Sequence, residues 1–241
     1  AGASDFENFT MGEGRGDAPS IEFLYPPQIT PGLGTSPAFV HSILTGTYDT
    51  RDGRGVATRG GYVGASLHSY TGVGDAGSFG RLDLYALDHL KVGNRFVVSG
   101  RARFQTTLGD GAAVPYFLLP SVGSGSTLRA YAAQRFRGLH TVLGTVEGRW
   151  LVREFRINFL RSEVGLELAT FYDVGQVADQ PGDLFDALED DFGLGARLHW
   201  RNTTPVRVDL RSEINPFAKR REKLTPRQRR TRDRRKPAPK R

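Results

Sequence analysis

The sequence predicts an all-β fold made of antiparallel strands. The chain of 241 residues contains 30 glycines and 10% aromatic residues, a composition typical of β-rich proteins. Apolar and polar residues alternate over strand-length segments, and no segment reaches the roughly 20 apolar residues that a membrane-spanning helix needs. A helical membrane protein is therefore excluded. A transmembrane β-barrel remains open, because its alternating strands score weakly on average hydropathy.

The alternation is clearest over residues 164–175. One face of this expected strand is apolar, with Val164, Leu166, Leu168, Thr170, Tyr172 and Val174. The other face carries the carboxylates of Glu167 and Asp173. Such a strand fits a membrane barrel with a polar lumen, or a soluble β-sandwich whose polar face meets water.

Seven other segments are expected to form strands with the same two faces: 39–50, 61–70, 79–90, 95–108, 139–151, 192–200 and 206–211. Their polar faces carry charges of both signs at mid-strand, which suits a wet lumen whose groups pair across it. Tyr70, Trp150, Tyr172 and Trp200 lie near strand ends, where they fit the aromatic girdles of a barrel. The pattern favours the transmembrane barrel over the sandwich.

The basic character belongs to one end of the sequence. Residues 219–241 hold 13 Lys and Arg against two acidic residues, which leaves 20 basic and 24 acidic residues for the rest. A run of like charge attracts nucleic acid or acidic lipid, but we expect 218–241 to be a basic disordered tail without a nucleic-acid partner. The alternative is a shifted reading frame that replaces a closing strand. Residues 1–38 are expected to be a loop-rich lead-in or a truncated end, and 39–217 the barrel segment.

The sequence gives no sign of enzymatic chemistry. The absence of cysteine excludes disulfides, thiolate zinc sites and cysteine nucleophiles. The five histidines are scattered, so neither a metal site nor a catalytic triad is expected. Glu147, Glu167 and Asp173 resemble an acid and base set for sugar hydrolysis, but Arg149 and Arg197 lie on similar strands. Structural ion pairs are the better interpretation, and we expect no enzyme and no cofactor.

Residues 119–138 form a loop that is too long and too rich in Gly and Ser for a hairpin turn. The loop also carries Leu128, Tyr131, Phe136 and three arginines, which a merely solvated loop does not need. We therefore expect the loop to fold back onto the strands.

Four segments together resemble the barrel of the BamA/TamA outer-membrane assembly family, also called bacterial surface antigens. They are residues 48–52 with Arg59-Gly60, the loop LPSVGSGSTLRAYAAQRFRG, EGRW at 147–150 and FYDVG at 171–175. The resemblance spans about 39–211 and implies a larger antiparallel barrel in the bacterial outer membrane. The sequence itself is expected to hold only about nine strands, so it would be the carboxyl-terminal part of such a barrel. It also implies insertion or export of other outer-membrane or secreted proteins. The implied partners are outer-membrane lipid, client β-barrel or secreted proteins, and accessory assembly proteins.

The resemblance further implies that the loop tucks into the lumen, where Arg129 meets Asp173 on the wall. The supporting residues are Leu128, Tyr131, Glu147, Arg149, Phe171 and Gly175, the last leaving room for the loop. A charged pair inside a lumen is screened less than one at the surface, although its desolvation limits the net gain. Two departures stand out. Ala130 occupies the position where the family usually has glycine, and the basic residues follow where an aromatic-ended last strand is expected.

Overall fold

The computed structural model describes residues 2–5, 30–53, 56–157, 162–200 and 203–214. This part of the chain is all-β, and its helical elements are three single 3-10 turns, η1 (Gly111–Ala113), η2 (Tyr116–Leu118) and η3 (Pro181–Asp183). No helix among the described residues has the length and apolarity needed to cross a membrane. Most of the expected lead-in, residues 6–29, and the basic segment 218–241 lie outside the described residues.

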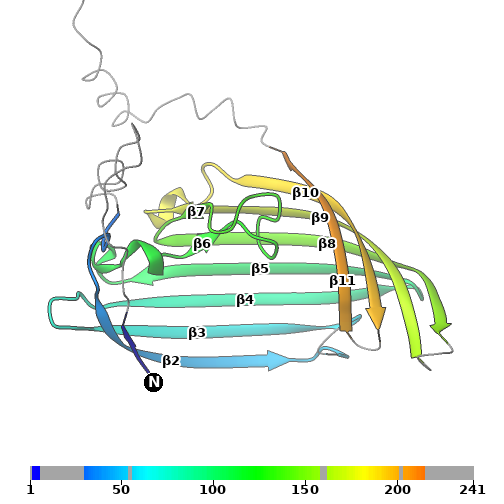
Figure 1. Ribbon diagram of the computed structural model, residues 1–241, viewed down its shortest axis with the longest axis horizontal. Helices are drawn as coiled ribbons and strands as arrows, with labels where there is room; N and C mark the ends of the chain where they lie inside the picture. Colours follow the sequence, from blue (N-terminus) through cyan, green and yellow to red (C-terminus); the bar gives the residue numbers. More distant parts are fainter. Residues whose placement is uncertain (1, 6–29, 54–55, 158–161, 201–202, 215–241) are drawn as a thin grey trace, which may run out of the picture.

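Nine strands form one antiparallel sheet in which neighbours in space are neighbours in sequence, apart from the step from β5 to β8 (Figure 1). The strands are β1 (Gly2–Asp5), β2 (Ala38–Asp49), β3 (Gly60–Val73), β4 (Phe79–Val92), β5 (Phe96–Leu108), β8 (His140–Ile157), β9 (Ser162–Ala178), β10 (Glu189–Trp200) and β11 (Thr203–Ile214). The short strands β6 (Ser121–Val122) and β7 (Phe136–Arg137) pair with each other.

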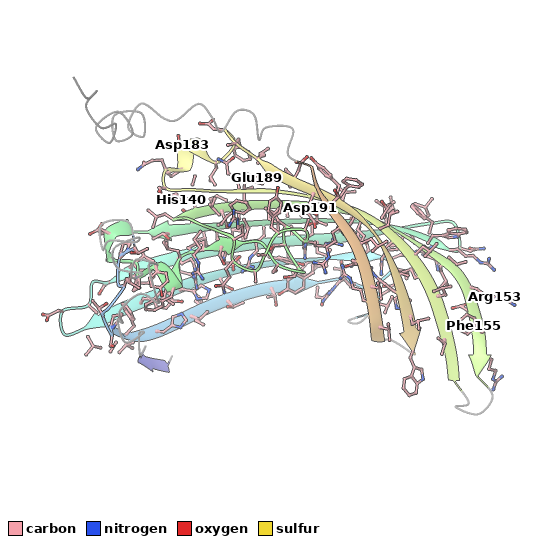
Figure 2. All side chains as sticks on the ribbon, turned by 45° about the horizontal axis from the view of Figure 1, so that its top comes forward. His140, Arg153, Phe155, Asp183, Glu189 and Asp191 are labelled. Atoms are coloured by element: carbon pink, nitrogen blue, oxygen red, sulfur yellow. The ribbon has the colours of Figure 1, made fainter. Side chains whose placement is uncertain are left out.

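The sheet is strongly curved and open. Strands β2 to β5 run side by side, whereas β9 to β11 bend across in front of them (Figure 1). Within the described residues the sheet does not close, since β1 pairs only with β2 and β11 only with β10. The segment between β5 and β8, residues 109–139, lies on the concave side and is called the inner loop below (Figure 2).

Each of the eight long strands overlaps one of the segments predicted to be a strand, with ends that shift by up to six residues. The prediction of antiparallel β structure is therefore confirmed. The strand β1 was not predicted, since 1–38 was expected to be loop. Gly2–Asp5 pairs with Ala38–His41 in antiparallel register, and pairing onto a sheet edge needs no side-chain alternation.

The sheet has two chemically different faces. Directly paired residues of antiparallel strands point to the same side, so register carries each face across the sheet. The outer face is the one that carries Leu168, Tyr172 and Leu194, and the inner face carries Glu147, Asp173 and Arg197. Large apolar side chains of the outer face are exposed on every long strand: Val40, Leu44, Leu67, Leu84, Leu90, Phe96, Val146, Trp150, Leu168, Tyr172, Leu194 and Leu210.

No second sheet covers the outer face within the described residues. The only other sheet there is the two-stranded β6 and β7, which belongs to the inner loop. Leu168 is 43% exposed and Tyr172 42% exposed, whereas Asp173 on the opposite face is fully buried. A β-sandwich would require the reverse, because its apolar face lies beneath a second layer.

Eight of the buried apolar residues gather in two small clusters on the inner face. The first joins Phe39, Tyr70 and Phe79 of β2 to β4 with Val114 of the inner loop. The second joins Val122, Leu128 and Tyr131 of the inner loop with Leu143 of β8. The loop therefore folds back onto the strands, as the sequence predicted.

One expected girdle residue does not face outward. Tyr70 is only 5% exposed, and its ring stacks on Phe79 with 4.6 Å between centroids. The expectation that Tyr70 joins an outer aromatic girdle is wrong, because Tyr70 shares the inner face with His68, two positions earlier in β3. Trp150, Tyr172 and Trp200 do lie exposed on the outer face.

Candidate functional site

The inner loop presents Leu128 to Tyr131 to the wall of the sheet because its own base is fixed. Strands β6 and β7 clamp the base, and the Gly123 N–H donates to Thr127 Oγ1 over 2.9 Å. Gly123 has φ of 104°, in the left-handed region that favours glycine. Leu128 is fully buried in the second apolar cluster, so the next residue, Arg129, is directed into the wall.

Arg129 contacts three wall residues at once. Its Nη1 donates to Glu147 Oε2 over 2.9 Å, and its Nε lies 2.9 Å from Asp173 Oδ2. The guanidinium carbon lies 3.8 Å from the ring centroid of Phe171, a cation–π contact. The Arg129 side chain is 5% exposed, so these contacts are largely shielded from water. The structure thus brings together Arg129, Asp173, Glu147 and Phe171.

Gly193 of β10 makes room for the Phe171 ring. A Cβ built on Gly193 would lie 2.4 Å from the Phe171 ring, closer than any side-chain carbon can approach. Any larger residue would therefore displace the ring from beneath Arg129. Gly175 has a different role from the expected one. A Cβ there would meet the Val142 carbonyl at 2.8 Å, so Gly175 permits close packing on β8 rather than approach of the loop.

Two buried carboxylates lie side by side at the centre of the site. Asp173 of β9 and Asp191 of β10 are directly paired in register, and both are fully buried. Asp191 Oδ2 accepts the Ala130 N–H over 3.1 Å. The Asp173 oxygens have no aligned hydrogen-bond donor among the described residues, so the Arg129 contact is an ion pair by distance only. Because buried like charges repel, Arg129 is the cation on which this pair depends.

A second arginine supports the site from β10. Arg197 grips Glu147 in a bidentate pair, with Nη1 to Oε1 at 2.8 Å and Nη2 to Oε2 at 2.6 Å. Glu147 is therefore held by two guanidinium groups, and a planar fork fixes its orientation as well as its charge. Arg197 Nη1 also lies 3.5 Å from Glu167 Oε1, and His199 Nε2 lies 3.2 Å from Glu167 Oε2.

The loop also reaches the last two strands of the sheet. The Tyr131 hydroxyl donates to Glu189 Oε2 over 3.2 Å, and Arg211 Nη1 donates to the Arg129 carbonyl. Figure 2 shows Glu189 and Asp191 on β10 beside the inner loop. The short stretch from Leu128 to Tyr131 therefore contacts β8, β9, β10 and β11 together.

Sequence reasoning missed Glu189, Asp191 and Arg211 as partners of the loop. The predicted strand 192–200 began after both acidic residues. Extending its alternation backward from Arg197 through Gly195 and Gly193 places Asp191 and Glu189 on the inner face, which was the available signal. Arg149 was expected to support the pair, but its Nη2 donates to the Ala57 carbonyl, and no hydrogen bond or ion pair joins it to the described part of the loop.

Comparisons with known proteins do not identify a family for this chain. No protein-family model matches the chain, and no curated protein matches it. Among the described residues, no group of three or more His, Asp and Glu side chains could hold a metal ion. The charges at the site are paired mostly with each other, an arrangement that suits anchoring of the loop.

Proposed function

We propose that the sheet is part of an antiparallel transmembrane β-barrel in the bacterial outer membrane, of the assembly and translocation type, as in the BamA/TamA family. Its role is to insert or export other outer-membrane or secreted proteins. The observation that carries the proposal is Arg129 of the inner loop, bound at once to Asp173, Glu147 and Phe171. This is the contact that the resemblance implies between loop and wall.

The outer face supports the membrane location. Its exposed Val, Leu, Phe and Trp side chains come from every long strand, and burying one such side chain gains about 1.5–3 kcal/mol. A contiguous apolar surface of this extent is rare on a soluble monomer and marks contact with lipid or protein. The inner face supports a wet lumen, because its charges pair across strands instead of facing hydrocarbon.

The free sheet edges support the assembly role. Within the described residues, the edge of β11 that lies away from β10 pairs with no strand, so it presents main-chain donors and acceptors. An extended client segment can add to such an edge by main-chain hydrogen bonds, with alternate side chains directed to lipid and lumen. The inner loop would hold β8 to β11 in one curvature while the client strand pairs.

A passive porin-like channel is the alternative within the same fold. The placement of the loop disfavours it, because residues 128–131 are anchored across four strands on the concave face where a channel would run. A soluble β-sandwich binding module is disfavoured by the uncovered outer face.

The test is to refold the full chain into lipid vesicles and measure the folding rate of an unfolded outer-membrane β-barrel client. We expect the wild-type protein to accelerate client folding and Arg129→Ala to abolish most of that acceleration. Arg135→Ala removes an exposed arginine from the same loop and serves as the matched control.

Two results would count against the proposal in different ways. A chain that remains a soluble monomer in the presence of vesicles contradicts the membrane location. A chain that inserts, with heat-modifiable mobility, but leaves the client rate unchanged contradicts the assembly role and favours the channel.

A further inference from the structure

A hollow of about 730 Å³ lies on the outer face of the sheet and crosses the strands from β2 to β9. Its floor consists of small residues from four neighbouring strands: Gly61, Ala86, Gly100, Ala102 and Gly144. Tyr48 of β2 borders the hollow at one end and Tyr172 of β9 at the other, five strand spacings or about 24 Å away along the sheet. The hollow is therefore long, and its floor lets another molecule approach the backbone closely.

Asp88 of β4 brings a carboxylate into this apolar hollow. Asp88 pairs in register with Gly100 of β5, which places its side chain on the outer face, where it is exposed. A Cβ built on Gly61 would lie 3.2 Å from Asp88 Oδ1, so the carboxylate reaches over the glycine of β3. The other charged residue of the lining, Arg101, belongs to the inner face and donates to Thr145 there. Asp88 is thus the charged side chain on the outer side of the hollow.

Asp88 lies within the apolar band and not at its border. On the outer face of β4, Leu84 and Ala86 precede Asp88, while Leu90 and Val92 follow it, and all four are exposed. Val92 ends β4 about 14 Å farther along the strand. Because an aspartate side chain has a single methylene group, the carboxylate cannot extend past these apolar residues to the water at the end of the strand.

The Asp88 carboxylate has neither an ion pair nor a hydrogen bond within the described residues. By contrast, Asp83 on the inner face of the same strand is held by Arg103 through two nitrogens. No Lys, Arg or His occupies an outer-face position of β2 to β5. A carboxylate inside a lipid-facing band is unfavourable without a cation, and such a residue usually marks a functional site. These strands therefore leave a place for a cation that another molecule supplies.

We propose that this hollow binds a membrane-spanning segment of a partner protein that carries one Lys or Arg among small apolar residues. The cation of the partner meets Asp88, and its apolar residues pack on the floor, where glycine and alanine permit close contact. Charge complementarity favours such a segment over a lipid, because an acyl chain carries no cation for Asp88. The inference rests on the proposed membrane location and is independent of the effect on client folding.

The experiment measures energy transfer in vesicles from the tryptophans of the full chain to an acceptor on a synthetic membrane-spanning peptide. Two peptides of leucine and alanine are compared, one with a central lysine and one with glutamine in its place. We expect the wild-type chain to bind the lysine peptide about tenfold more tightly, the usual scale of a polar contact between membrane segments. Asp88→Asn should reduce this preference to within about twofold. Asp75→Asn removes an exposed carboxylate from the turn between β3 and β4 and should keep the preference.

A further variant, Gly100→Leu, tests the hollow itself. A Cβ built on Gly100 meets no atom within 4 Å, so the variant should fold, while its side chain fills the floor and weakens the binding of both peptides by similar factors. Unchanged binding in this variant would place the peptides elsewhere and overturn the proposal.

Two other results would also overturn it. Equal binding of the two peptides by the inserted wild-type chain would mean that lipid alone fills the hollow, and an undiminished preference in Asp88→Asn would exclude Asp88 as the partner of the cation. Heat-modifiable mobility reports insertion in the same vesicles. A chain that does not insert contradicts the membrane location and this inference with it, whereas a chain that shows the preference but leaves client folding unchanged contradicts the assembly role alone.

Discussion

The two halves of the inner loop are held to the sheet by opposite kinds of chemistry. Residues 111–119 attach to β2, β3 and β4 through Val114, which is buried among Phe39, Tyr70 and Phe79. Residues 128–131 attach to β8 through β11 mainly through charges and hydrogen bonds centred on Arg129. Apolar packing tolerates modest changes of side-chain shape. Removing one member of a buried ion cluster instead leaves the remaining charges without a partner. Removing one charge from the charged half should therefore cost more stability than trimming a side chain in the apolar half.

Breaking the charged half should have the largest effect. Arg129→Ala leaves Asp173 and Asp191 buried without their cation and should cost about 3–5 kcal/mol, the usual result of removing one partner from a buried pair. Urea unfolding in detergent micelles measures this loss, with Arg135→Ala as the exposed control. Equal stability of the two variants would mean that the charged half does not anchor the loop.

Disrupting the apolar half should cost less stability and should leave the charged half of the loop in place. Val114→Ala removes two buried methyl groups and leaves a small cavity, for a loss of about 2 kcal/mol. Limited trypsin digestion then distinguishes the release of the charged half from the release of the apolar half. Cleavage after Arg135 should accelerate in Arg129→Ala but remain slow in Val114→Ala. Faster cleavage in both variants would show that the two halves release together.

Ala130 offers a finer test of the charged half. Among the described residues other than glycine, only Gln134 has positive φ, so the Ala130 backbone needs no glycine despite the usual family preference. Ala130→Gly should therefore lower stability by about 0.4–1 kcal/mol, because it adds freedom to the unfolded chain. A gain in stability in the same urea titration would show that Ala130 is strained.

The smallest effect is expected far from both halves, in the turn between β2 and β3. Hydrogen bonds from the Thr58 hydroxyl and N–H lower the pKa of Asp52 to about 2. Because the folded pKa lies below the ordinary value of about 3.9, the contribution is complete above about pH 4 and is lost as pH falls through about 2. Carbon-13 titration of Asp52 should show Thr58→Ala raising this pKa. An unchanged pKa in that variant would exclude Thr58 as its cause.

The alternation of side chains predicted which residues share a face, and the resemblance predicted the pairing of Arg129 with Asp173. The faces follow from local order, since a period of two fixes the two sides of a strand. The long-range pair of Arg129 and Asp173 was predicted only through the resemblance. The contacts of Glu189, Asp191 and Arg211 could not be predicted in the same way. They depend on the curvature that brings β10 and β11 over the loop, which no local pattern encodes.

The buried position of Tyr70, which packs against the apolar half of the loop, was also not predictable from local sequence. Its place near the end of β3 suggested an interfacial aromatic, but Phe39, Phe79 and Val114 converge on it from three other segments. Long-range convergence of this kind is decided by the folded sheet rather than by the order of residues in one strand.

The most direct test of the central claim is a scan of single cysteines along β9, from 166 to 173, each carrying a spin label in vesicles. The chain has no cysteine of its own, so every label reports one site. We expect a period of two, with labels at 166, 168, 170 and 172 accessible to oxygen dissolved in lipid. Labels at 167, 169, 171 and 173 should be shielded from it. Equal access of a water-soluble reagent to both sets would contradict the claim that one face meets lipid and the other holds the loop.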